Sequence, residues 1–181
     1  METIISIKPL LAVLVPLFVI PVLISSSSKP NLRESWIFIA GTIKLVLVLS
    51  MVPVILSGKQ IALTLFEIAP GAAIAFRVDG LGMTFALVAA SLYIITSVYS
   101  IGYMRGLDEH GQTRFVSFFA LAISATIGAA FSANLMTLYL FYEILSLATY
   151  PLVAHHQDQN SRISGRRYLS FILGTSIGLV L

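Results

Sequence analysis

Residues 135–154 read LMTLYLFYEILSLATYPLVA, and this stretch decides the class of fold. A helix rises about 1.5 Å per residue, so about 20 mostly apolar residues cross the roughly 30 Å hydrocarbon core of a bilayer. The stretch is of that length and carries one charged residue, Glu143, near its centre. It therefore predicts a transmembrane helix with an ionisable group held inside the membrane.

The composition of the whole chain agrees with this prediction. The 181 residues are 57% hydrophobic and 10% charged, with a mean hydropathy of +0.95. Soluble domains carry about 25% charged residues, and disordered chains combine low hydrophobicity with high net charge, so both classes are excluded. We predict a single all-α domain over residues 1–181, a polytopic transmembrane helix bundle with five full spans and a truncated sixth, at about 4–25, 36–56, 81–104, 115–133, 135–154 and 168–181.

The sixth span is the short one. Residues 168–181 give only about 21 Å of helix, which does not reach across a bilayer. We therefore expect the sequence to be the N-terminal part of a longer membrane domain.

Residues 60–80, between the second and third spans, do not resemble another crossing. They contain charged residues and two runs in which apolar and polar residues roughly alternate, separated by Pro70-Gly71. This pattern predicts a short β-hairpin on the outer face that turns at Pro70-Gly71. A re-entrant or interfacial helix is the alternative.

The loop charges predict the orientation in the membrane. With an outside N-terminus, the inward loops hold seven basic residues and the outward segments three, and cytoplasmic loops are usually the more basic ones. The chain is thus expected in the cell (inner) membrane as a multi-pass protein with its N-terminus outside. The inward residues are Lys29, Arg33, Arg105, Arg114, Arg162, Arg166 and Arg167, and the outward ones are Lys8, Lys59 and Arg77.

Several kinds of site are not expected in this chain. The absence of cysteine excludes disulfides, thiolate nucleophiles and iron–sulfur ligation. The basic residues are scattered between apolar runs and form no patch for nucleic acid. The three histidines, His110, His155 and His156, do not have a metal-ligand spacing. We expect no cofactor and no bound metal.

Glu143 is the main candidate for function. An acidic residue in mid-membrane costs at least about 2.5–3.5 kcal/mol to insert, so such residues usually face the bundle interior and serve a function. Tyr139, Ser146 and Tyr150 stand four or three residues apart on the same helical face. This pattern predicts a proton relay through Glu143. The alternative is a neutral glutamic acid held by a structural hydrogen bond.

Three other residues are weaker relay candidates. Lys44 is the only cation inside a span, where it could pair with an acid, but we favour a lysine whose amine reaches back to the inner surface. His155 and His156 follow the fifth span at the inner interface and could accept protons at a channel mouth, although loop histidines are more often simply solvated.

Four short motifs resemble one membrane protein family. They are FRVDGL at 76–81, LFYEILSL at 140–147, GRRYL at 165–169 and LGTS at 173–176. Together with Asn134-Leu135, they resemble the antiporter-like membrane subunits of respiratory complex I (NADH-quinone oxidoreductase), membrane-bound hydrogenases and Mrp-type cation/proton antiporters.

The resemblance implies more than the composition does. Members of this family have about fourteen helices with two inverted five-helix repeats, and Glu143 matches their fifth-helix glutamate. The lysine that works with that glutamate would lie after Leu181. The expected function is proton translocation, with cation/proton antiport as a further candidate, among membrane and redox subunits that hold the redox centres. The alternatives are a non-transporting structural subunit or split-gene half, and a small homo-oligomeric carrier.

Overall fold

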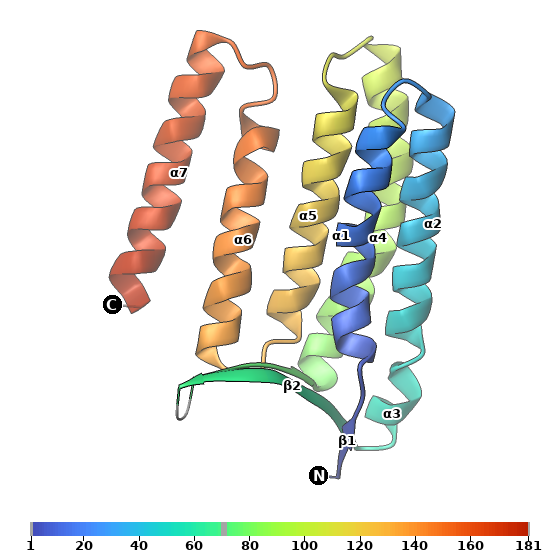
Figure 1. Cartoon of the computed structure of the whole chain (residues 1–181), viewed down its shortest axis with the longest axis vertical. Coiled ribbons are helices and arrows are strands. Elements are labelled where there is room, and N and C mark those ends of the chain that lie inside the picture. The colour runs from blue at the N-terminus through green and yellow to red at the C-terminus, as the bar shows by residue number, and fades with distance from the viewer. Residues whose placement is uncertain (1, 70–71, 181) are drawn as a thin grey trace.

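The computed structural model describes residues 2–69 and 72–180, and it is a helical bundle with a small sheet at one end (Figure 1). The helices are α1 Lys8–Ser25, α2 Pro30–Leu49, α3 Val52–Leu56, α4 Gly80–Gly106, α5 Gln112–Ala130, α6 Leu135–Val153 and α7 Gln159–Val180; the strands are β1 Thr3–Ile5, β2 Gln60–Ala69 and β3 Ala72–Val78. Five helical segments are long and apolar enough to cross a membrane, and their bounds are Lys8–Ser25, Pro30–Leu56, Gly80–Gly106, Gln112–Ala130 and Leu135–Val153. The predicted fold class is thus confirmed, and the chain is a multi-pass membrane protein.

The long helices stand side by side and alternate in direction (Figure 1). The central helix α1 packs against α2 and α5, while α6 packs between α5 and α7. The sheet lies across the end of the bundle that holds the N-terminus, which we call the sheet end. The opposite end, the loop end, carries the connections 26–29, 107–111 and 154–158.

The core contains small residues where helices meet. Ala12, Ala86 and Ala90 are fully buried in the cluster that joins α1 to α4. A β-carbon at Gly128 of α5 would come within 2.6 Å of Cγ of Phe141 on α6. Small residues let helix backbones approach closely, which is how helices associate in a bilayer that gives them no hydrophobic driving force.

The predicted hairpin is confirmed as the antiparallel pair β2 and β3, with Ile61 opposite Val78. The turn predicted at Pro70-Gly71 lies outside the described residues. The sheet also has a third strand that the hydropathy pattern did not predict, because Thr3–Ile5 pairs in parallel with β2. The first helix consequently begins at Lys8 and not near residue 4.

Two polar residues fix the start of α6 on this sheet. The Asn134 side chain accepts a hydrogen bond from the Thr137 N–H at 2.8 Å and so caps the helix, while its amide donates to the Ala73 carbonyl oxygen at 2.8 Å. The buried Thr137 hydroxyl accepts a hydrogen bond from the Ala75 N–H at 3.0 Å. The helix that carries Glu143 therefore rises from a defined point on β3.

At the loop end, two helices are longer than the hydropathy predicts. The helix α2 begins at Pro30, and its Arg33 is buried and donates hydrogen bonds to Thr113 and Gln112 at 3.0 and 2.8 Å. The helix α7 begins at Gln159 rather than near residue 168. The first turns of both helices are rich in polar residues. The apolar run in the sequence therefore begins later than the helix itself.

Candidate functional site

Glu143 lies near the middle of α6 on a side that meets α7. The side chain is half-buried, and its Oε1 accepts a hydrogen bond from the Ser176 hydroxyl of α7. A carboxylate oxygen has several acceptor positions, so this bond leaves capacity for water or for a proton. The carboxyl group is therefore hydrogen-bonded to a neighbouring helix, and that single bond does not use its full hydrogen-bonding capacity.

A cavity of about 370 Å³ lies beside Glu143, between α6 and the sheet. Tyr139 lies one helical turn before Glu143, lines the same cavity and is close enough to interact with the carboxylate. The cavity wall is almost entirely apolar, and the other residues that line it are Phe66, Ile74, Met136 and Leu140. Glu143 thus lies beside an apolar space between α6 and the sheet.

The other two residues of the predicted polar face lie elsewhere. The Ser146 side chain is buried, and its hydroxyl donates to the Tyr142 carbonyl oxygen of its own helix at 2.9 Å. Tyr150 lines a second cavity, of about 380 Å³, near the loop end, together with Arg114, Phe118, Pro151, Ala154, Gln157, Arg162 and Arg166. The structure therefore brings Tyr139 together with Glu143 and places Ser146 and Tyr150 apart from them.

The contact between α6 and α7 contains a second polar pair, Thr149 and Tyr168, whose hydroxyl oxygens lie 3.0 Å apart. Sequence reasoning missed both Ser176 and Tyr168 as partners of α6. The two residues are eight positions apart, which places them on one face of a helix. That spacing was visible in the sequence, but the helix that the face would meet was not.

Lys44 of α2 is completely buried against Tyr93 of α4, whereas Glu143 belongs to α6. Its Nζ lies 3.8 Å from the centre of the Tyr93 ring and has no hydrogen-bond partner among residues 2–69 and 72–180. The expectation that the amine reaches the inner surface is wrong. The aromatic ring supplies a nearer contact, since the electron-rich face of a phenol ring attracts an amine.

All three histidines gather at the loop end. The rings of His110 and His155 stack with their centres 5.3 Å apart, and those of His155 and His156 are 5.9 Å apart. Arg114 of α5 donates a hydrogen bond to the His155 carbonyl oxygen at 2.6 Å. Burial and the nearby Arg114 guanidinium hold the pKa of His155 below its ordinary value, which favours a neutral imidazole.

The histidines do not have metal-ligand spacing along the chain, but folding changes their arrangement. Glu109, His110 and His156 each direct a ligand atom to one place, and these three atoms lie within 4.8 Å of one another. The sequence could not reveal this cluster because its members belong to two loops that are joined to different helices.

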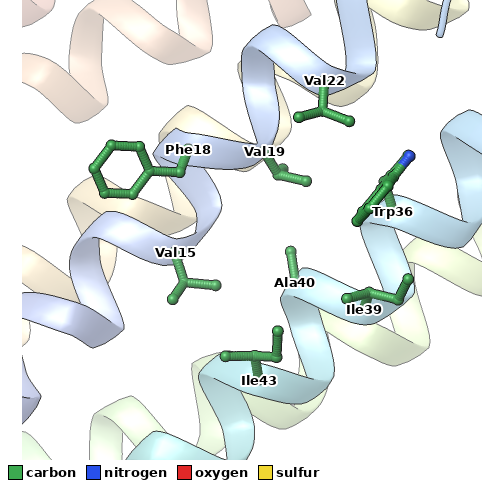
Figure 2. Close-up of a pocket in the computed structure, with 8 residues that line it drawn as sticks. All are labelled: Val15, Phe18, Val19, Val22, Trp36, Ile39, Ala40 and Ile43. Atoms are coloured by element: carbon green, nitrogen blue, oxygen red, sulfur yellow. The ribbon is translucent and has the colours of Figure 1, made fainter.

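A further groove lies between α1 and α2, and hydrophobic side chains line it (Figure 2). Its volume is about 240 Å³, and its lining residues are Val15, Phe18, Val19, Val22, Trp36, Ile39, Ala40 and Ile43. None of these side chains is ionisable, and Phe18 is 70% exposed. Such a surface suits contact with lipid and offers no group for proton chemistry.

Comparison with known proteins gives matches in both sequence and fold. Residues 70–116 match the family described as NADH-Ubiquinone oxidoreductase (complex I), chain 5 N-terminus. A Na(+)/H(+) antiporter subunit A1 from Staphylococcus aureus is 27% identical over 160 residues, which cover 86% of this chain and 20% of that protein. The same subunit from S. aureus strain bovine RF122 / ET3-1 is 31% identical over 87 residues, covering 48% of this chain and 11% of that protein.

The fold is shared with a solved membrane complex. One chain of the membrane-bound sulfane sulfur reductase (MBS), an archaeal respiratory membrane complex, superimposes with a TM-score of 0.76 at 18% identity, covering 91% of this chain and 34% of that chain. The present chain is much shorter than its relatives and spans about a fifth of the length of the S. aureus antiporter subunit that is 27% identical to it. The resemblance predicted from the motifs is confirmed: the chain is similar in sequence to a complex I subunit family and to Na(+)/H(+) antiporter subunits, and in fold to a chain of the MBS complex.

Proposed function

We propose that this chain carries protons through the membrane as part of a multi-subunit antiporter-type complex, and that Glu143 binds and releases the proton. The observation that carries the proposal is the position of Glu143, near the middle of α6, half-buried, and beside a cavity that it shares with Tyr139. An acidic residue is costly to place inside a membrane and usually serves a function there, and a positioned carboxyl group can take up and release a proton.

The hydrogen bond from Ser176 supports this assignment over a purely structural acid. A hydroxyl group can donate to a carboxylate and can also accept from a protonated carboxyl group, since it has both functions. Ser176 can therefore serve as a partner in either protonation state. A partner with that property suits a group that changes its charge during transport.

The names of the relatives favour cation/proton exchange as the process. The matched S. aureus proteins are called Na(+)/H(+) antiporter subunits. We propose that sodium ions are the counter-substrate, and that membrane subunits outside this chain complete the pathway. The cation that pairs with Glu143 would come from a helix outside residues 1–181, because the Lys44 amine lies against Tyr93 of α4. A proton-pumping subunit of a quinone oxidoreductase or a hydrogenase is the second candidate, and the match to complex I chain 5 favours it.

We also propose an orientation in which the loop end faces the cytoplasm and the N-terminus faces outward. The support is the basic side chains at the loop end, including Lys29, Arg105 and Arg114, which flank the connections there. Basic residues next to membrane helices are retained on the cytoplasmic side.

The functional proposal is tested by transport in everted membrane vesicles that contain the whole complex. A fluorescent pH indicator reports the collapse of a proton gradient when sodium is added. Glu143→Gln should abolish that collapse, and Glu143→Asp should retain part of it. The matched control is Glu67→Gln, which makes the same chemical change on the exposed strand β2 and should leave transport intact. Full transport by Glu143→Gln vesicles would overturn the proposal. A proton gradient that forms on addition of an electron donor and does not respond to sodium would favour the redox-pump candidate.

A further inference from the structure

Two loops at the loop end meet around a cluster of nitrogen and oxygen donors. Glu109 and His110 belong to the connection between α4 and α5, and His156 belongs to the connection between α6 and α7. One ligand atom from each of these residues lies within 4.8 Å of the other two. Residues far apart in the sequence are thereby brought to one point at the surface.

The backbone that carries these donors is well fixed. The Glu109 N–H donates to the Met104 carbonyl oxygen at 2.9 Å, and Gln112 donates its side-chain amide to the same oxygen at 3.3 Å. Arg114 reaches across to the His155 carbonyl oxygen at 2.6 Å and so holds the second loop against the start of α5. The side chains of His110 and His156 are exposed, and both rings lie next to the ring of His155.

We propose that Glu109, His110 and His156 bind a divalent transition-metal ion of the zinc class. Zinc takes imidazole nitrogens and carboxylate oxygens at about 2.0–2.2 Å in a tetrahedron, which separates neighbouring donors by about 3.3 Å. The Oε2 of Glu109 and the Nδ1 of His110 already lie 3.6 Å apart. Three protein ligands leave a fourth position for water, as in zinc sites that keep an open coordination position.

The ligand set also selects the class of metal. Magnesium and calcium ions require six or more oxygen ligands, and this cluster offers one carboxylate with two imidazoles. Nitrogen-rich sets of this kind suit zinc, cobalt and nickel.

His155 gives a second reason to expect a ligand here. Both of its ring nitrogens are buried and lack a hydrogen-bond partner in the part of the chain that the structure describes. Its Nε2 lies 3.9 Å from the Oε2 of Glu109. Buried polar atoms normally have a partner, and a water molecule on a metal held by Glu109 would provide one.

A metal at this point would act as a cross-link. It would join the α4–α5 connection to the α6–α7 connection, and α6 is the helix that carries Glu143. Because the metal binds the folded arrangement and not the separated loops, it would stabilise the attachment of the α6–α7 pair to the rest of the bundle. This inference does not depend on proton transport by Glu143.

The test is a titration of the metal-stripped protein with zinc chloride. The protein is extracted in mild detergent with the subunits that accompany it, and it carries a Strep-tag, since a polyhistidine tag would itself bind zinc. Calorimetry should show one more zinc ion per chain for the wild type than for Glu109→Gln or His156→Asn, or an affinity at least about tenfold higher. The control Asp108→Asn removes the same charge from the neighbouring residue, which is not one of the three ligands, and should bind as the wild type does.

Hydrogen exchange gives an independent readout. Zinc should slow the exchange of residues 154–158 in the wild type and in Asp108→Asn, but not in His156→Asn, and a large excess of magnesium should not reproduce the effect. The absence of saturable zinc binding to the wild type would overturn the proposal. Zinc binding that is unchanged in both Glu109→Gln and His156→Asn would overturn it as well, because the metal would then reside elsewhere.

Discussion

The hydroxyl group of Ser176 on α7 donates a hydrogen bond to Oε1 of Glu143 on α6. The bond joins two helices within the apolar part of the bundle, and Thr149 and Tyr168 form a second polar contact between the same helices. Interhelical hydrogen bonds in a membrane contribute modestly to stability, about 0.6 kcal/mol on average. The larger consequence of the Ser176 bond is the placement of the Glu143 carboxyl group.

Ser176→Ala should therefore slow transport without abolishing it. A lost hydrogen bond to a charged group costs about 1.5–3 kcal/mol, so we expect a decrease of roughly tenfold to hundredfold in the sodium-driven proton flux of vesicles. Thr175→Ala is the matched control, because the neighbouring Thr175 hydroxyl is exposed and donates to the Phe171 carbonyl oxygen of its own helix. Equal fluxes from the two variants would show that Ser176 has no part in positioning Glu143.

Lys44→Met should leave transport unchanged and keep or raise the unfolding temperature. The Lys44 amine is buried without a hydrogen-bond partner among the described residues, a situation that costs about 1–3 kcal/mol, and the Tyr93 ring offsets part of this cost. Methionine fills a similar volume with no polar atom. Thermal unfolding in detergent measures the stability, and vesicle flux measures transport. A loss of flux in a stable Lys44→Met protein would assign the lysine to the proton path.

Gly128→Ala should destabilise the bundle at the contact between α5 and α6. The added methyl group would meet the Phe141 ring, and overpacking of this kind costs about 1–3 kcal/mol. Gly102→Ala in α4 is the control, because its methyl group would meet no atom of the described residues within 4 Å apart from its chain neighbours and the adjacent backbone of its own helix. Unfolding temperatures that differ by less than the error of the measurement would contradict the close approach of these two helices.

Single cysteines test the orientation, because the natural chain contains none. With the N-terminus outside, Glu67→Cys on β2 should react with a membrane-impermeant maleimide in intact cells. Asn160→Cys near the start of α7 should react only after the cells are permeabilised. Both positions are exposed, so burial does not limit the reaction. The reverse labelling pattern would place the sheet end in the cytoplasm.

Much of the fold was predictable because a bilayer imposes simple rules on sequence. Apolar length revealed the five spans, and alternation around Pro70-Gly71 revealed the hairpin. The cap of α6 is equally local, because the Asn134 side chain accepts a hydrogen bond from the Thr137 N–H three residues later. These features depend on neighbours in the sequence, which is why the sequence alone carries them.

The remaining features depend on contacts between distant residues. The pairing of Thr3–Ile5 with β2 joins segments that an entire helical hairpin separates. The burial of Lys44 depends on Tyr93 of another helix, and the gathering of Glu109 with His156 depends on two loops that meet only after folding. No local pattern encodes such meetings, so hydropathy and spacing could not predict them.

The central claim is that the Glu143 carboxyl group gains and loses a proton inside the membrane, and infrared difference spectroscopy measures this most directly. Spectra of the reconstituted complex at acidic and alkaline pH should differ by a carbonyl stretch of a protonated carboxylic acid, which shifts in heavy water. The account predicts that one component of this band is missing from Glu143→Gln and is retained in Glu67→Gln. An identical band in wild type and Glu143→Gln would mean that another acid changes its protonation and would contradict the account.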